Sequence, residues 1–342
     1  MEKVDIIIVG AGVVGLAIAA QVSKQYPNKA VVLLEKWEKF GQETSGRNSE
    51  VIHAGMYYPT GSLKAKLCVH GNSLLYAYCA ANKIAHQRIG KIIITRNAKE
   101  EEAVQEIYEQ GQKNGVTGLR YLTKAEVNEM EPNIFATGAL FSENTGIISS
   151  HELMKALEWQ ATEQGAMLAY AHTVKQVEKT SGGYAVHFVN QEGEDALECE
   201  YLFNCAGLYS DMIPQQLGID IDKEGYRIYP VKGEYFSLAA GKSKMMSHLI
   251  YPPPLADLKG LGTHITKGLD GMAKLGPSAF YVNSKEDYHV DKNHLAEFYQ
   301  AGHSFLPFIN KEDLEADMAG IRPKNQAPGA PWADFIITAE AK

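Results

Sequence analysis

The apolar residues near the start of the chain change spacing twice, which predicts a strand, a helix and a second strand. Val4–Val9 is a β-branched run typical of a buried parallel strand, and glycines follow it. Val13–Tyr26 has helical spacing and ends before Pro27. A second apolar run, Ala30–Leu34, stops at Glu35. This order predicts the βαβ-type opening of a Rossmann unit.

Helical spacing recurs in three later segments, which are Leu63–Asn82, Glu100–Lys113 and Ile147–Gln164. The apolar positions that predict the first of them are Leu67, Leu74, Leu75 and Tyr78. The last helix opens with Ser149 three residues before Glu152, a pattern that predicts Ser149 as N-cap of a capping box.

Strand-like runs dominate the middle and late chain. They are Lys91–Thr95, Thr173–Val189 with a turn at Ser181-Gly182-Gly183, Ala196–Cys205, Tyr226–Leu238, and Gly262–Leu275 with a hairpin turn at Asp270-Gly271. Short glycine turns between such runs indicate antiparallel pairing. The fold class predicted is α/β, with a Rossmann-type nucleotide-binding domain beside an antiparallel β-rich (α+β) substrate domain.

Composition narrows the function classes. The 342 residues, 45% hydrophobic and 22% charged, allow a folded protein of about two domains. A net charge of −8 without a block of Lys and Arg disfavours nucleic-acid binding. The four cysteines form no CxxC pair and no metal-like cluster, so we expect reduced packing residues and no metal site. They are Cys68, Cys79, Cys199 and Cys205.

The first apolar stretch is not expected to be a signal peptide or a membrane anchor. Val4–Ala20 contains Asp5, is interrupted by glycines and lacks a basic n-region. Met1 lies so close to the first strand that no room for a transit peptide is expected. We predict a cytoplasmic location and leave open peripheral contact with the inner membrane.

The first strand ends in a glycine motif. Gly10-Ala11-Gly12-Val13-Val14-Gly15 fits GxGxxG, and Glu35 lies 20 residues after Gly15 at the end of the second strand. The glycines allow a pyrophosphate to approach the helix N-terminus, and the acid suits a ribose hydroxyl. The motif predicts dinucleotide binding, and Glu35 disfavours NADP. FAD and NAD remain alternatives on this motif alone.

A second segment, Thr44–Tyr58, is dense in small, polar and aromatic residues. Gly46 and Gly55 would let backbone lie against a flat ring, and Arg47, Asn48 and Ser49 offer hydrogen-bond donors. His53 could accept a proton from a substrate hydroxyl because its ordinary pKa lies near neutrality. A structural histidine is the alternative.

A third segment, Asn204-Cys205-Ala206-Gly207, closes an apolar strand. Its glycine would let backbone approach the cofactor where the chain returns to the nucleotide domain. A plain strand-end turn is the alternative.

The sequence resembles the FAD-dependent D-amino-acid-oxidase-like (DAO) superfamily, and within it the L-2-hydroxyglutarate dehydrogenase/oxidase-like flavoproteins. The resemblance runs through most of the chain. It is carried by residues 7–17, 44–58 and 61–68, by Asn204-Cys205-Ala206-Gly207-Leu208-Tyr209-Ser210-Asp211, by Lys232-Gly233-Glu234-Tyr235 and by Gly320-Ile321-Arg322-Pro323-Lys324.

The resemblance implies FAD as cofactor. The residues expected to bind it are Gly10, Gly12, Val14, Gly15, Glu35, Lys36, Thr44, Ser45, Arg47, Asn48, Ser49, Val174, Ala206 and Gly207. It also implies oxidation of a 2-hydroxy acid, most simply L-2-hydroxyglutarate to 2-oxoglutarate, by hydride transfer to flavin N5. The electron acceptor implied is oxygen or a membrane quinone.

The resemblance also assigns substrate contacts. His53 matches the family's histidine beside the flavin, and Arg322 of the G-x-R-P segment would bind a carboxylate, which suits a planar guanidinium. A surface ion pair is the alternative for Arg322. Candidates for a second carboxylate are Lys64, Lys66, Tyr57, Tyr251 and His264. The two lysines could instead be solvated, and His264 could face solvent.

The predicted domains are discontinuous. The FAD-binding domain is expected to comprise residues 1–85, 145–215 and 318–342, and the substrate-binding domain residues 86–144 and 216–317. The chain departs from the family pattern after Asp334-Phe335-Ile336-Ile337-Thr338, because it stops at Lys342 where a glycine-containing turn and a final helix are expected. A fragment and a truncated flavoprotein are the two explanations.

Three rivals remain to the 2-hydroxy-acid hypothesis. They are an FAD-dependent amino-acid or amine oxidase of the same superfamily, a flavin-binding remnant without activity and an NAD-dependent dehydrogenase.

Overall fold

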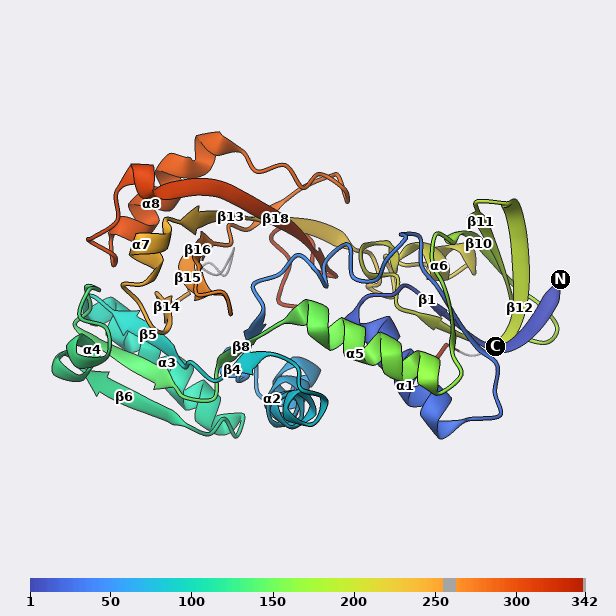
Figure 1. Cartoon of the computed structure of the whole chain (residues 1–342), viewed down its shortest axis with the longest axis horizontal. Helices are drawn as coiled ribbons and strands as arrows, with labels where there is room; N and C mark the ends of the chain where they lie inside the picture. The colour runs from blue at the N-terminus through green and yellow to red at the C-terminus, as the bar shows by residue number, and fades with distance from the viewer. Residues whose placement is uncertain (255–262, 341–342) are drawn as a thin grey trace.

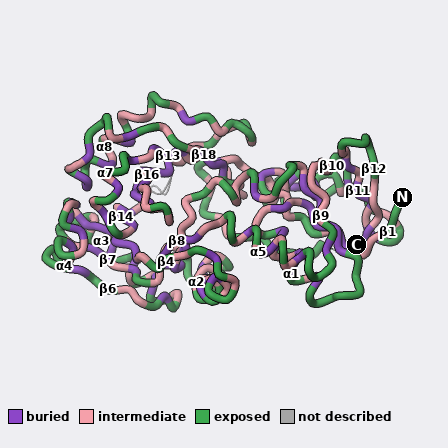
Figure 2. The backbone as a smooth tube through the Cα atoms, in the orientation of Figure 1, coloured by how far each residue is buried: buried purple, intermediate pink, exposed green. Residues whose placement is uncertain are grey.

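A computed structural model describes residues 1–254 and 263–340 of the chain. Figure 1 shows an elongated molecule with one sheet at each end, joined by long strands and by the first part of the chain. Buried backbone gathers in the sheets at both ends (Figure 2). The predicted α/β class, with a Rossmann-type unit and a β-rich unit, describes this architecture. The domain boundaries given above stay a prediction.

The first sheet is six-stranded and has the order β10-β11-β12-β1-β2-β9. Its strands are β1 (Glu2–Val9), β2 (Val31–Leu34), β9 (Met167–Ala169), β10 (Thr173–Lys179), β11 (Tyr184–Asn190) and β12 (Gly193–Asn204). β1 runs parallel to β2 and β12, as the buried β-branched runs predict. The hairpin of β10 and β11 is antiparallel.

Helices cover both faces of this sheet. On one face, α1 (Val13–Gln25) and α5 (Ser150–Glu163) bury Leu16 and Leu157 against Ile6 and Ile8 of β1. On the other face, α6 (Met212–Gln216) brings Ile213 into a core with Ile7 and Val9. Alternate residues of β1 therefore face opposite layers, which explains why the whole run is apolar.

The second sheet is nine-stranded and has the path β17-β13-β16-β15-β14-β5-β7-β6, with β18 also paired to β13. Its strands are β5 (Lys91–Thr95), β6 (Leu119–Thr123), β7 (Gly138–Ser142), β13 (Tyr229–Leu238), β14 (Leu249–Tyr251), β15 (His264–Lys267), β16 (Ala273–Gly276), β17 (Phe280–Tyr281) and β18 (Leu314–Lys324). The pairings are antiparallel except between β14 and β5. The expected antiparallel character of the late chain is confirmed.

The remaining elements connect these sheets. A small sheet joins β3 (Val51–Ile52), β8 (Gly146–Ile148) and β4 (His86–Gln87). The other α-helices are α2 (Leu63–Asn82), α3 (Ala98–Lys113), α4 (Lys124–Met130), α7 (Ala240–Ser243) and α8 (Leu295–His303). Short 3₁₀ turns are η1 (Gly207–Tyr209), η2 (Lys292–His294) and η3 (Lys311–Asp313).

One local prediction needs correction. Helix α2 has the predicted bounds, although Leu67 and Leu74, two of the apolar positions whose spacing predicted it, are 46% and 54% exposed. The Ser149 hydroxyl caps α5 as expected, yet the capping box is not formed. The Glu152 carboxylate instead accepts a hydrogen bond from the Ala85 backbone N–H at 2.7 Å, so a tertiary contact replaces the reciprocal local bond.

The hairpin turn at Asp270-Gly271 is confirmed. It joins β15 to β16, and Gly271 has φ +81°, a conformation that glycine adopts without strain. Gly262, the predicted first residue of this run, lies outside the described residues.

Candidate active site

The glycine motif forms a tight turn between β1 and α1. Gly10 has φ +104°, and a Cβ on it would lie 2.5 Å from the Cys205 carbonyl oxygen. A Cβ on Gly15 would lie 1.9 Å from the Gly10 carbonyl oxygen. Helix α1 begins after Gly12 without a capping side chain of that residue and without an acid in its first turn. Apart from the Val13 N–H, which donates to the Ser45 hydroxyl, this helix N-terminus suits the pyrophosphate of a dinucleotide.

Glu35 and Lys36 follow β2 beside this turn. The Glu35 carboxylate accepts hydrogen bonds from the backbone N–H of Ala11 at 2.7 Å and of Trp37 at 2.9 Å. Burial raises the pKa of Glu35, and these two bonds oppose that effect. The Lys36 ammonium lies 4.0 Å from the centroid of the Tyr209 ring. The acid is therefore fixed beside the glycine turn, and its contact with a ribose stays a prediction.

Thr44, Ser45 and Ser49 connect the glycine turn to the second sheet. The Ser45 hydroxyl accepts a hydrogen bond from the Val13 N–H at 3.0 Å, and the Thr44 hydroxyl donates to the Ile321 carbonyl at 2.9 Å. Ser49 hydrogen-bonds to the Tyr235 side chain. These bonds fix the segment between α1, β13 and β18.

Arg47 and Asn48 lie in the same segment. Asn48 donates to the Ser45 carbonyl at 2.7 Å, and the Arg47 guanidinium lies 4.2 Å from the centroid of the Tyr288 ring. A Cβ on Gly320 would lie 2.1 Å from the Arg47 carbonyl oxygen, so β18 passes directly against the segment.

The remaining predicted cofactor residues lie in or next to elements of the first sheet and its helix α1. Ala206 and Gly207 follow β12, next to the Cys205 carbonyl that abuts Gly10. Val14 is exposed in the first turn of α1. Val174 packs, partly buried, at the edge of the β1–β2 core. Close contacts bring Cys205, Glu35 and Ser45 to the glycine turn. The binding of FAD by the full set of residues stays a prediction.

His53 follows β3, and its backbone carbonyl is hydrogen-bonded to side chains of α2. Its carbonyl accepts hydrogen bonds from the Asn72 side chain at 3.0 Å and from the Cys68 thiol at 3.6 Å, both on α2. Burial, together with the charges of Lys91, His264 and Arg322, lowers the pKa of His53 to about 3. The imidazole is thus neutral at neutral pH and lies within electrostatic reach of two cations.

Arg322 lies on β18, where it pairs with Val231 of β13. Its side chain is exposed, and among the described residues it has no hydrogen bond or ion pair. Its charge acts on His53 and Tyr58. The surface ion pair that was the alternative for Arg322 is therefore not formed within the described part of the chain.

Tyr57, Tyr251 and His264 come together around a residue that the sequence analysis missed. The Tyr251 and His264 rings stack at 3.7 Å between centroids, and both are buried. The Lys91 ammonium lies 4.6 Å from the centroid of the Tyr57 ring and 4.6 Å from that of Tyr251. A lysine at the start of the apolar run Lys91–Thr95 was the available signal, but it was assigned only to a strand.

Of the two lysines that were candidates for a second carboxylate, Lys64 lies within electrostatic reach of Arg322. The Lys64 ammonium donates to the Ala333 carbonyl at 2.6 Å, and its backbone N–H donates to Asp334 at 3.0 Å. Lys66 is exposed on α2. Lys64 thus connects Ala333 and Asp334 to the start of α2, and its ammonium is already hydrogen-bonded.

We expect Lys91→Met to raise the stability of the protein at pH 7. Burial lowers the pKa of Lys91 to about 7, so in the folded state the charged form is penalised at every pH below its unfolded value near 10.5. The penalty is about 1.4 kcal/mol for each pH unit between the two pKa values. It is fully present below pH 7 and vanishes above pH 10.5.

Urea unfolding at pH 7 and pH 10 measures this effect. The stabilising effect of Lys91→Met should be several kcal/mol at pH 7 and should shrink toward pH 10. A variant that is less stable than the parent at pH 7 would show that Lys91 has a structural partner.

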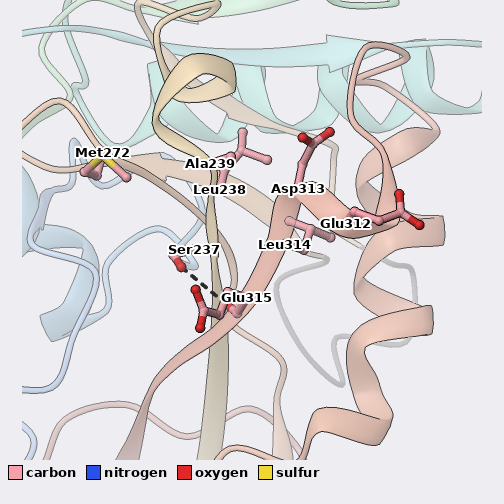
Figure 3. Close-up of a pocket in the computed structure, with 8 residues that line it drawn as sticks. All are labelled: Ser237, Leu238, Ala239, Met272, Glu312, Asp313, Leu314 and Glu315. Carbon is pink, nitrogen blue, oxygen red and sulfur yellow. Dashed lines mark hydrogen bonds between the residues drawn. The ribbon is translucent and has the colours of Figure 1, made fainter.

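A small pocket at the far end of the β13–β18 ladder is a poor alternative site (Figure 3). It is lined by Ser237, Leu238, Ala239, Met272, Glu312, Asp313, Leu314 and Glu315. Three carboxylates in this lining disfavour an anionic substrate. The pairing of Leu238 with Leu314 places the pocket at the opposite end of the ladder from Arg322.

Within residues 1–254 and 263–340, none of the helices combines the length and the apolar composition that crossing a membrane requires.

The chain is similar to FAD-dependent enzymes in sequence and structure. Residues 5–340 match the DAO family model, described as FAD dependent oxidoreductase. The chain is 33% identical to the mitochondrial L-2-hydroxyglutarate dehydrogenase of Arabidopsis thaliana, over 99% of this chain and 77% of the relative. It is 30% identical to the L-2-hydroxyglutarate dehydrogenase of Salmonella houtenae, over 98% of this chain and 86% of the relative.

A solved structure shares the fold. It is the L-α-glycerophosphate oxidase from Mycoplasma pneumoniae with FAD bound, at a TM-score of 0.85 and 25% identity, over 94% of this chain and 84% of that one.

Proposed function

The chain belongs to the DAO family of FAD-dependent oxidoreductases, and from this membership we propose that it oxidises L-2-hydroxyglutarate to 2-oxoglutarate. The sequence resemblance and the FAD cofactor predicted from it are confirmed, so an NAD-dependent dehydrogenase is not retained. The observation that carries the substrate proposal is a neutral histidine, His53, within electrostatic reach of the unpaired guanidinium of Arg322. Two relatives that match most of the chain carry this activity in their names.

The chemistry divides between cofactor and protein. FAD, when bound, supplies the acceptor for the hydride that leaves the substrate Cα. Arg322 binds the carboxylate next to that carbon, because its planar guanidinium can donate two parallel hydrogen bonds. His53 accepts the proton of the substrate hydroxyl at a ring nitrogen, since its imidazole is neutral at neutral pH. The carboxylate also offsets the Arg322 charge that lowers the pKa of His53, which makes the ring a better base once substrate is bound.

An anaerobic substrate panel tests this proposal. Holoenzyme is mixed with L-2-hydroxyglutarate, D-2-hydroxyglutarate and small amino acids while the visible flavin absorbance is followed. We expect bleaching with L-2-hydroxyglutarate. Bleaching by amino acids alone would identify an amino-acid oxidase, and a colourless protein that takes up no FAD would identify a remnant. The acceptor, oxygen or a quinone, follows from which of them restores the absorbance.

We expect Arg322→Leu to lower kcat/KM for L-2-hydroxyglutarate by roughly 30- to 3,000-fold, the effect of removing one partner of a close charged pair. Arg322→Lys should lower kcat/KM by a smaller factor. It keeps the positive charge, although it cannot donate two parallel hydrogen bonds. Steady-state kinetics with a redox dye measures both. Arg120→Leu, at an exposed arginine of β6, is the control. Equal kinetics for Arg322→Leu and the control would remove Arg322 from the substrate site.

A further inference from the structure

Lys91 is a buried cation whose ammonium has no hydrogen-bond partner among the described residues. It opens β5, a central strand of the nine-stranded sheet, and its side chain has no exposed surface. In the register of the sheet it lies opposite Leu249 of β14. Leu249 belongs to the apolar core that also contains Tyr251 and Ile93, so Lys91 enters that core from the same face. Charged side chains are rarely found there unless an anion accompanies them.

Two polar neighbours of Lys91 also lack hydrogen-bond partners among the described residues. Five buried side-chain nitrogen or oxygen atoms of the described residues lack a hydrogen-bond partner, and three of them are Lys91 Nζ, Tyr57 Oη and Tyr251 Oη. The two tyrosine rings flank the ammonium, which favours its charged form, but rings do not accept the three hydrogen bonds that an ammonium offers. Such a cluster of donors fits an oxygen-rich anion.

The cluster lies beside the proposed reaction centre. The pKa of His53 responds to Lys91 and to Arg322, so the histidine has one cation in the core and one at the exposed side. A molecule whose reacting carbon meets His53 and whose first carboxylate meets Arg322 can therefore offer a second anionic group to Lys91.

We propose that Lys91, between the rings of Tyr57 and Tyr251, binds the second carboxylate of a dicarboxylic substrate and so determines the preference for dicarboxylates over monocarboxylates. The inference rests on the proposed function for the position of the first carboxylate at Arg322. The Lys91 ammonium donates to the carboxylate, and the two tyrosine hydroxyls are the additional donors.

Equilibrium binding to the FAD-loaded enzyme tests this proposal. The probes are 2-oxoglutarate and 2-oxopentanoate, which have the same length and differ in the second carboxylate, and binding is followed by the change in the flavin spectrum. We expect the parent enzyme to bind 2-oxoglutarate at least about 30-fold more tightly. In Lys91→Met the ratio should fall to within about threefold, with the affinity for 2-oxopentanoate unchanged. The matched control, Lys99→Met at an exposed lysine of α3, should keep the parent ratio.

A pH series on the parent enzyme gives a test that needs no variant. Burial lowers the pKa of Lys91 to about 7, so its charge is lost as the pH rises to 9. We expect the affinity for 2-oxoglutarate to fall at least about tenfold from pH 7 to pH 9, and that for 2-oxopentanoate less than threefold. The other titratable or charged groups around the cluster are His53, Tyr57, Cys68, Tyr251, His264 and Arg322.

The outcomes separate this inference from the proposed function. Three results would overturn the role of Lys91. They are an unchanged affinity ratio in Lys91→Met, an equal loss of affinity for both probes in that variant, and an equal fall in affinity for both probes as the pH rises. A parent enzyme that oxidises 2-hydroxy acids without preferring dicarboxylates overturns it as well, while the proposed function stands. The parent enzyme could show an affinity ratio that depends on Lys91 while no 2-hydroxy acid bleaches its flavin. That result would support the dicarboxylate site and overturn the proposed reaction.

Discussion

Replacing His53 by glutamine is expected to lower the rate of flavin reduction by L-2-hydroxyglutarate by about 100- to 10,000-fold, the usual contribution of a general base. Glutamine has a similar length and can hydrogen-bond to the substrate hydroxyl, but it cannot take its proton. Anaerobic stopped-flow reduction measures the step directly. His70→Gln, at an exposed histidine of α2, is the matched control and should reduce at the parent rate.

Two further readouts separate a base from a structural histidine. In the substrate-free enzyme the pKa of His53 is lowered to about 3, so the imidazole stays neutral down to pH 5. We therefore expect kcat/KM between pH 5 and pH 8 to show no acid limb arising from this residue. His53→Gln should also keep FAD and bind 2-oxoglutarate normally. A loss of less than tenfold in the reduction rate, or an equal loss of FAD binding, would contradict the assignment.

Gly15→Ala should abolish FAD retention. The new methyl group would lie 1.9 Å from the Gly10 carbonyl oxygen, so helix α1 must move away from the turn that follows β1. Rigid backbone cannot accommodate this, and the displaced helix no longer presents its N-terminus to the pyrophosphate. The flavin absorbance of the purified protein, before and after incubation with FAD, measures the result.

The matched control is Gly71→Ala on helix α2. A Cβ at Gly71 meets no atom within 4 Å, so alanine should be tolerated and should favour the helix by about 1 kcal/mol. Far-ultraviolet circular dichroism of Gly15→Ala distinguishes loss of the site from loss of the fold. Normal FAD content in Gly15→Ala would show that the glycine turn does not hold the cofactor.

Features with a local cause could be predicted from the sequence. The bounds of α2 and β5, the N-cap Ser149 and the hairpin at Asp270-Gly271 depend on spacing, capping and turn chemistry within a few residues. Which apolar residues of α2 are buried was not predictable in this way, because Leu67 and Leu74 have helical spacing but remain exposed.

The nucleotide-binding opening can be recognised from the sequence alone, and family resemblance adds the FAD cofactor. The pattern of Gly10, Gly15 and Glu35 depends on backbone conformation within one βαβ unit. It can therefore be recognised from about thirty consecutive residues. The same reasoning directed attention to His53 and Arg322, which lie in motifs that can be recognised along the chain.

The surroundings of each lysine depend on the tertiary structure. Lys64, Lys66 and Lys91 have the same side chain, and no local pattern distinguishes their functions. Lys64 is hydrogen-bonded to Ala333, Lys66 is exposed, and Lys91 is buried beside two tyrosines from other segments. The physical reason is that burial and charge balance are sums over contacts between residues far apart in the chain, and those contacts exist only once both sheets have formed.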